Sequence, residues 1–60
     1  MSEKITQLRE ANGWNKADLA RKANVSPSLI TKIENGTTKG SIATLSKIAE
    51  VLGVTLKDLL

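Results

Sequence analysis

The segment VSPSLITKIENG, residues 25–36, holds the polar side chains whose spacing best suggests a chemical role. One face of a short helix would carry four of them, because they recur at i, i+3, i+4 and i+7: Ser28, Thr31, Lys32 and Asn35. Ser and Thr are small enough to approach base edges in a DNA major groove, and Lys reaches O6 and N7 of guanine. No acid interrupts this polar stripe, which favours a bound polyanion over a merely solvated face.

Catalytic and metal-binding chemistry is poorly supplied in the rest of the chain. His, Cys and Tyr are absent, so the usual neutral-pH acid, base and thiol nucleophile are missing. Ser28 and Lys32 lie one turn apart, but two polar residues on an exposed helix face explain them better than a Ser–Lys catalytic pair. The carboxylates are scattered without paired or metal-ligand spacing. We therefore expect no enzyme, no metal site and no cofactor.

The length and charge of the chain indicate one small basic domain, residues 1–60, near the lower limit for independent folding. The net charge of +3 favours polyanionic partners, although solubility alone also explains it. Neither a signal peptide nor an apolar run of membrane length is present. The sequence therefore predicts a cytoplasmic protein that does not enter a membrane.

Capping residues divide the chain into five short helices with brief connections. Helix starts are expected at Ser2, Asn15, Ser26, Ser41 and Thr55, and helix ends near Asn12–Gly13, Asn24, Gly36 and Gly53. Apolar residues at helical spacing predict the inward positions Ile5, Leu8, Ala11, Leu19, Ala20, Ala23, Ile30, Ile33, Ile42, Leu45, Ile48, Ala49 and Leu52. These patterns predict an all-α, compact five-helix domain with one common core.

Trp14 is the sole aromatic residue and lies between the first two expected helices. A platform on which a base stacks is one interpretation. Burial is favoured, because a single Trp supplies a large share of so small a core.

The second and third expected helices have the spacing of a helix-turn-helix. Their short connection demands a sharp crossing, with the small Ala20 at the contact and Asn24 at the bend, where a left-handed conformation suits Asn. Ile30 and Ile33 anchor the third helix underneath. In a helix-turn-helix, this last helix enters the major groove of DNA.

The segments LREANGWNKADLARKANVSPSLITKIENG and SIATLSKIAEVLGVTLKDLL together resemble the DNA-binding domain of the lambdoid repressor and Cro family, also called the XRE family. The resemblance covers essentially the whole chain. It implies a lambda-repressor-like fold, sequence-specific binding of double-stranded DNA, and a prokaryotic or phage transcriptional repressor. It also implies that Arg9 and Glu34 form a partly buried ion pair that holds the third helix on the scaffold; the residues alone would equally suggest two exposed charges.

The resemblance and the polar stripe together indicate which residues contact DNA. The expected base contacts are Pro27, Ser28, Thr31 and Lys32, and the expected phosphate contacts are Asn15, Lys16, Asn35, Thr37, Thr38 and Lys39. Lys16 stands where the family often has Gln, and it adds a full charge. Pro27 stands where several relatives carry a polar base-reading residue, so it offers only an apolar contact. Leu29 either touches a thymine methyl group or covers the edge of the core.

Other functional classes stay open at this point. A protein-interaction module, antitoxin-like or adaptor, could use the same fold, although it would more often expose an apolar or acidic third helix. The chain could also be the DNA-binding fragment of a longer regulator, because it ends on the apolar DLL. Finally, related domains dimerise near the C-terminal region, so we expect a weak homodimer on a pseudo-palindromic operator, formed through Val54, Leu56, Leu59 and Leu60.

Overall fold

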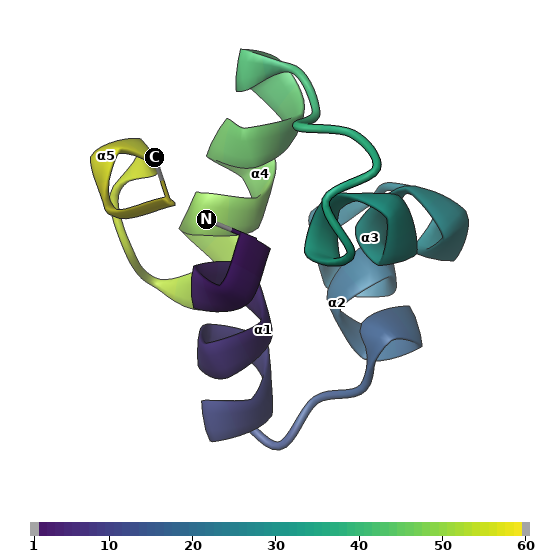
Figure 1. The fold of residues 1–60 in the computed structure, drawn as a ribbon. Coiled ribbons are helices and arrows are strands. Elements are labelled where there is room, and N and C mark those ends of the chain that lie inside the picture. Colours follow the sequence, from purple (N-terminus) through teal and green to yellow (C-terminus); the bar gives the residue numbers. More distant parts are fainter. Residues whose placement is uncertain (1, 60) are drawn as a thin grey trace.

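The computed structural model describes residues 2–59 as an all-α domain. Its helices are α1 (Ser2–Ala11), α2 (Lys16–Ala23), α3 (Pro27–Glu34), α4 (Ile42–Leu52) and α5 (Leu56–Leu59). The α2 helix packs on α3 and α4, and α5 packs on α4 and α1. Figure 1 shows α2 and α3 on one side of α1 and α4, with α5 on the other side. Within residues 2–59, no helix is long and apolar enough to cross a membrane.

Local capping explains where these helices begin. The Asn15 side chain accepts the Asp18 N–H at 2.7 Å, and the Asp18 carboxylate accepts the Asn15 N–H at 3.0 Å, forming a capping box at the start of α2. Ser26 caps α3 by accepting the Leu29 N–H at 3.1 Å, and Pro27 occupies the first helical position. Comparable caps start α4, at Ser41, and α5, at the reciprocal pair Thr55 and Asp58.

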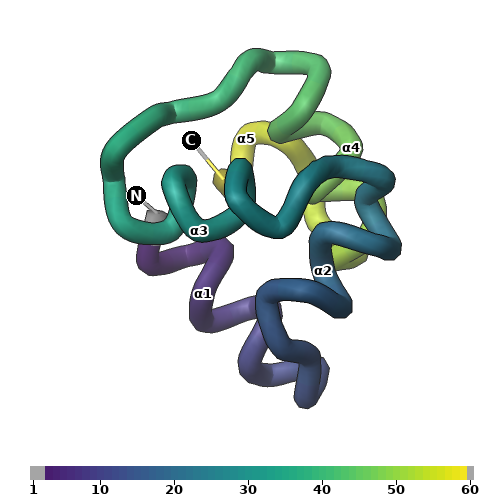
Figure 2. The backbone as a smooth tube through the Cα atoms, turned by 90° about the vertical axis from the view of Figure 1, so that its right-hand side faces the viewer, coloured from purple at the N-terminus to yellow at the C-terminus, as the bar shows by residue number. Residues whose placement is uncertain are grey.

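The turn between α2 and α3 has the predicted left-handed residue. Asn24 adopts φ 59° and ψ 45°, and the following Val25 N–H donates to the Ala20 carbonyl at 2.9 Å. This arrangement satisfies carbonyls that the end of α2 would otherwise leave unpaired. The tube in Figure 2 shows the chain turning sharply between α2 and α3, so that α3 lies across α2.

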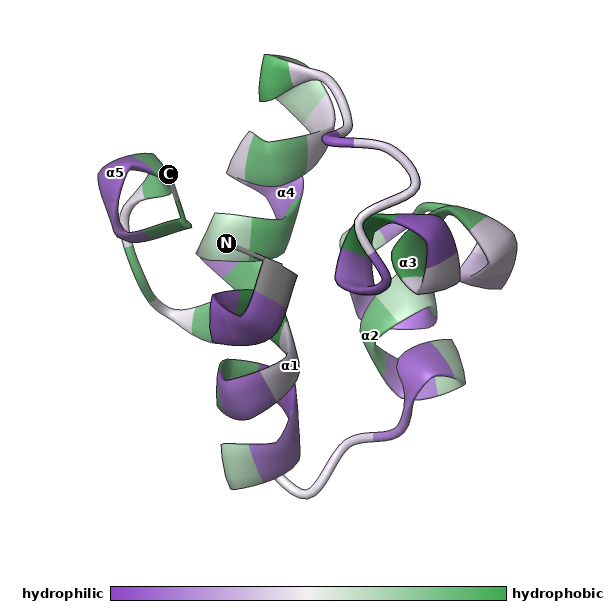
Figure 3. Ribbon diagram, viewed as in Figure 1, coloured by the Kyte–Doolittle hydropathy of each residue, from purple (hydrophilic) through white to green (hydrophobic). Residues whose placement is uncertain are grey.

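The core draws on all five helices, and Figure 3 shows hydrophobic residues recurring along them between hydrophilic ones. Its buried apolar members are Ile5, Leu19, Ala20, Ala23, Ile30, Ile33, Leu45, Ile48, Ala49, Leu52 and Leu59. Two expected members are exposed instead, namely Ala11 and Ile42. Arg9, one turn after Ile5, takes the inward position at the end of α1 in place of Ala11. Ile42 is 60 % exposed because it opens α4, where side chains tilt back beyond the helix start.

Trp14 is only partly buried, so its predicted place inside the core is partly wrong. Its side chain packs against the core cluster. The Lys22 ammonium lies 4.9 Å from the ring centroid, a cation–π distance. Trp14 therefore closes the edge of the core between the first two helices.

Candidate nucleic-acid interface

The α3 helix separates its apolar and polar residues cleanly between two faces. Ile30 and Ile33 are 0 % and 3 % exposed and fix the inner face against the core. Leu29 is half-buried against the same cluster, so it covers the core edge rather than standing free. All expected members of the outer polar stripe are exposed, as is the expected base contact at the helix start: Ser28, Thr31, Lys32, Asn35 and Pro27. The structure thus leaves these side chains available to a ligand on one surface.

The expected phosphate contacts flank α3 on two elements. Asn15 and Lys16 are exposed at the start of α2, where free N–H groups and the helix dipole favour an anion. Thr37 and Lys39 are exposed in the loop after α3, whereas Thr38 is half-buried and its hydroxyl accepts the Gly40 N–H at 3.4 Å. With Asn35 at the end of α3 also exposed, five of the six expected phosphate contacts are open to solvent, and the sixth, Thr38, is less accessible.

Gly40 holds this loop against α3, a role that the sequence patterns did not indicate. Its φ of +76° lies in the left-handed region, and a Cβ placed there would come within 3.1 Å of Ile33 Cδ1. A side chain at position 40 would therefore strain the backbone and press on the inner face of α3. The sequence signal was the isolated glycine between Lys39 and Ser41.

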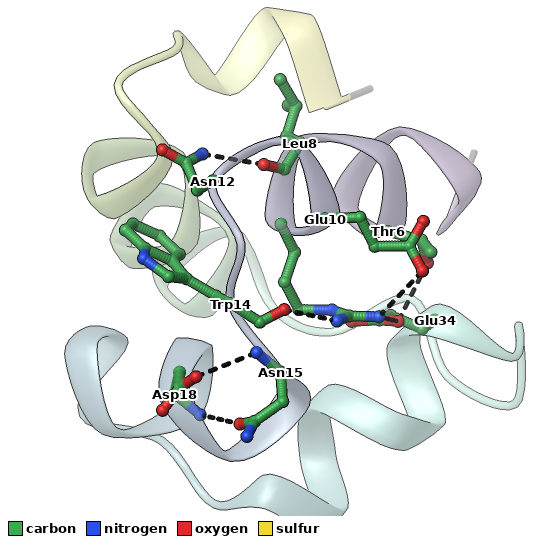
Figure 4. A network of polar contacts seen from close by, with 9 residues as sticks. Thr6, Leu8, Glu10, Asn12, Trp14, Asn15, Asp18 and Glu34 are labelled. Atoms are coloured by element: carbon green, nitrogen blue, oxygen red, sulfur yellow. Dashed lines mark hydrogen bonds and ion pairs between the residues drawn. The ribbon is translucent and has the colours of Figure 1, made fainter.

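A buried polar network fixes the end of α3 to α1 (Figure 4). Arg9 donates from Nε to Glu34 Oε2 at 2.8 Å and from Nη2 to Glu34 Oε1 at 3.0 Å, which is the expected ion pair. Thr6 donates its hydroxyl to Glu34 Oε1 at 2.9 Å. The third arm of Arg9, Nη1, reaches the Trp14 carbonyl at 2.8 Å. Because Trp14 immediately precedes the α2 cap, one guanidinium positions both elements that carry the expected DNA contacts.

Thr6 is the member of this network that the sequence did not identify. It stands three residues before Arg9, so both fall on the same face of α1. That spacing was the available signal, and it becomes informative only once Glu34 is known to lie opposite.

The environment of Glu34 keeps it ionised. Burial raises the pKa of this carboxyl, but hydrogen bonds from Arg9 and Thr6 and the charges of Arg9 and Lys16 together outweigh burial and hold the pKa below its usual range. The hydrogen bond to Glu34 likewise raises the pKa of Arg9. Both partners are therefore charged, and each offsets the cost of burying the other.

The expected dimer surface is smaller than the sequence suggested. Leu59 is 5 % exposed, so it belongs to the core of the domain and offers no free apolar surface. The short α5 helix turns this residue inward, where α5 packs on α4 and α1. Val54 and Leu56 are half-buried against the same core, and Leu60 lies outside the described residues.

Comparison with known proteins identifies the architecture. A helix-turn-helix family model matches residues 5–59. The chain belongs to this helix-turn-helix family. This confirms the predicted family, and the family consists of regulators rather than enzymes, in agreement with the missing catalytic residues.

Two curated relatives in this family are named as transcriptional regulators of the helix-turn-helix type. SinR of Bacillus subtilis is 38 % identical over 61 residues, and DdrOP3 of Deinococcus deserti is 33 % identical over 60 residues. Each alignment covers 100 % of the chain but only 55 % of SinR and 46 % of DdrOP3. The chain thus spans about half the length of these relatives.

Solved structures of SinR confirm the five-helix fold. The crystal structure of SinR in complex with DNA, where SinR is described as the master regulator for biofilm formation, matches with a TM-score of 0.93 at 34 % identity and covers 100 % of both chains. The complex of SinR with the protein SinI matches with a TM-score of 0.93 at 35 % identity, over 98 % of this chain and 58 % of that one.

Proposed function

We propose that this chain binds double-stranded DNA sequence-specifically and regulates transcription, with α3 in the major groove. The observation that carries the proposal is the exposed, acid-free stripe on α3, Ser28, Thr31, Lys32 and Asn35, on a helix whose opposite face is locked into the core. A relative with the same fold was crystallised with DNA. Ser28, Thr31 and Lys32 supply donors for base edges, and Pro27 supplies an apolar contact.

Phosphate contacts on either side of α3 would set its register on the duplex. Lys16 and Asn15 at the start of α2 take one strand, and Thr37, Lys39 and the remaining residues of that loop take the sugar-phosphate backbone beyond α3. The net charge of +3 adds long-range attraction. Such a protein acts where the DNA is, in the cytoplasm, and repression by occupying an operator is the simplest regulatory outcome.

Two lysines test the proposal because they should act differently. Lys16→Ala should weaken binding to every duplex alike. It should also reduce, by about one, the slope of the logarithm of the binding constant against the logarithm of the salt concentration. Lys32→Ala should cost about 1–3 kcal/mol mainly on the preferred site and relax the choice at one base pair. The matched control is Lys57→Ala in α5, which removes the same charge from an exposed position on the other side of the molecule.

The measurement is affinity for the preferred site, its single-base variants and random duplex, each over a range of salt. Selection from random duplexes identifies the preferred site and its half-site spacing beforehand. If Lys32→Ala lowers the affinity for all duplexes equally, Lys32 is a phosphate contact, and recognition of the base sequence depends on Ser28 and Thr31. If neither variant differs from Lys57→Ala, the DNA-binding proposal is wrong.

We also propose that two copies bind one operator, because a single short helix reads few base pairs. Val54 and Leu56 remain candidates for the weak contact, since both are half-buried near the C-terminal end. Half-sites should then lie about 34–36 Å apart or at a multiple of that distance. Sedimentation and the stoichiometry of the DNA complex test this, and one monomer on an asymmetric site at saturation would contradict it.

The relative SinR also forms a complex with SinI, so a protein partner is a second candidate function. A longer form of this chain could bind such a partner through residues beyond the DNA-binding face. Binding to DNA and to a protein are compatible, and Lys16→Ala and Lys32→Ala distinguish them, because these two variants change only the DNA-facing surface.

A further inference from the structure

Two Asn-Gly sequences follow helices in this chain, Asn12–Gly13 after α1 and Asn35–Gly36 after α3. All four residues are exposed. In such a sequence the glycine backbone nitrogen can attack the asparagine side chain, because no glycine side chain hinders the approach, and Asn is among the thermolabile residues. The two sequences are chemically identical, so a difference in their reactivity must come from the structure around them.

We propose that Asn35 is a site of spontaneous deamidation and that it reacts faster than Asn12. The Gly36 nitrogen forms a bond to Asn35 Cγ, the Cγ–Nδ2 bond breaks, and Nδ2 leaves as ammonia with the proton released by the Gly36 nitrogen. Water then adds to either carbonyl of the resulting succinimide ring and opens it to aspartate or isoaspartate. The step consumes water alone and involves no oxidation.

The Asn35 side-chain carbonyl is activated by a neighbouring donor. Its Oδ1 accepts the Thr37 N–H at 2.9 Å, and attack at Cγ places negative charge on this same oxygen. The Thr37 N–H is held in place because it also lies 2.9 Å from the Lys32 carbonyl. A positioned donor that faces a developing charge lowers the barrier, as in an oxyanion hole.

The attacking nitrogen is also less tightly held at Gly36. Its N–H donates to the Ile33 carbonyl at a long 3.3 Å. Ring closure requires rotation about the Asn35 Cα–C bond from its ψ of 2°. Asn35 is the C-cap of α3 and Gly36 already lies outside the helix at φ +81°, so this rotation disturbs only the exposed end of α3.

Asn12 is held in a different arrangement, visible in Figure 4. Its Nδ2 donates to the Leu8 carbonyl at 2.8 Å, which turns the side chain back over α1. The Gly13 N–H donates to the Glu10 carbonyl at 2.9 Å, a shorter bond than the one at Gly36. Both differences favour reaction at Asn35. The hydrogen bond from the Thr37 N–H to the charge that develops on Asn35 Oδ1 should raise the rate of ring closure about tenfold.

Deamidation at Asn35 would weaken DNA binding, an effect that depends on the proposed function. The product adds a negative charge at the C-terminal end of α3, where the helix dipole already disfavours anions. The same charge would face the phosphates that Asn35 is proposed to contact. The same reaction at Asn12 adds its charge at the end of α1, away from the stripe.

The test is incubation of the intact protein at mildly alkaline pH, below its unfolding temperature, followed by digestion and mass spectrometry. Aspartate and isoaspartate should accumulate about ten times faster at position 35 than at position 12. In urea the two rates should converge, because only the fold distinguishes the sites. Equal rates in the folded protein, or a faster reaction at position 12, would overturn the proposal.

Gly36→Ala and Gly13→Ala are matched controls. At either position a Cβ would meet no atom within 4 Å, while φ values of +81° and +74° strain both alike. Gly36→Ala should abolish the fast reaction and leave Asn12 unchanged, and Gly13→Ala should do the reverse. If circular dichroism shows that Gly36→Ala unfolds, Asn35→Gln supplies the same comparison. The ring that Gln would have to close with the Gly36 nitrogen contains one more atom than the succinimide.

DNA affinity separates this proposal from the proposed function. Asn35→Asp should bind DNA more weakly than Asn12→Asp, which adds the same charge elsewhere. If position 35 deamidates fast but Asn35→Asp binds as well as Asn12→Asp, the modification site stands and the phosphate contact assigned to Asn35 is wrong.

Discussion

Replacing Glu34 with Gln should destabilise the domain severely, because it leaves the buried Arg9 guanidinium with only the exposed Glu10 carboxylate, 4.0 Å away, as a counter-charge. The Arg9 and Glu34 side chains are 9 % and 5 % exposed, so water does not compensate for the loss. Breaking a buried pair by removing one partner costs about 3–5 kcal/mol. The free energy of unfolding is about 0.05–0.15 kcal/mol per residue, so that of the whole 60-residue domain is only about 3–9 kcal/mol. The variant should therefore lose at least a third of its stability, and in the lower part of that range it would not fold.

The Arg9–Glu34 ion pair can also be tested from the Arg9 side and by removing both charges. Arg9→Met alone should also cost about 3–5 kcal/mol, because it leaves the Glu34 carboxylate with the Thr6 hydroxyl as its remaining donor in this network. The double variant Arg9→Met with Glu34→Gln removes both charges, so it should be no less stable than either single variant. It retains a cost of about 1–3 kcal/mol for each polar partner left unpaired, chiefly the Trp14 carbonyl.

The assay is urea unfolding of the parent, both single variants and the double variant, followed by circular dichroism. The double-mutant cycle then gives the coupling free energy between Arg9 and position 34. Destabilisation of the double variant by the sum of the two single changes would refute the reasoning, because it would show that neither charge depends on the other.

Three further outcomes follow from the structure. Trp14→Ala should cost about 2 kcal/mol, less than the ~3–5 kcal/mol of a fully buried Trp, and iodide should partly quench Trp14 fluorescence in the parent. Asn24→Ala should lower the free energy of unfolding by about 1 kcal/mol in urea titrations, whereas Asn24→Gly should not, because φ 59° penalises a Cβ. In acid, stability should fall: the folded pKa of Glu34 lies below its usual range, so its contribution is complete above the unfolded pKa and is lost as the pH drops through the folded one. Asp18 and Asp58 shift in the same direction through backbone hydrogen bonds at their caps, so a pH titration of the double variant above should keep part of this loss.

The sequence alone determined the helices and the helix-turn-helix. Caps, left-handed turn residues and apolar spacing act over four or five residues, so Asn15 with Asp18, Ser26 with Pro27, and Asn24 could be placed before any tertiary contact was known. The exposed stripe on α3 followed for the same reason, because fixing Ile30 and Ile33 inward forces the intervening residues outward. These predictions concern one helix or one turn at a time.

Tertiary structure decided how far each residue is buried and which distant residues meet. Helical spacing placed Ala11 and Ile42 inward, yet both stand at helix ends where no neighbouring helix covers them. Leu59 was expected on the surface, yet α5 turns it into the core. Thr6 and the Trp14 carbonyl join the Arg9–Glu34 pair because α1, α3 and the start of α2 converge on one point. Such convergence depends on how the helices pack, and local sequence patterns carry no record of which side chains will face each other across the core.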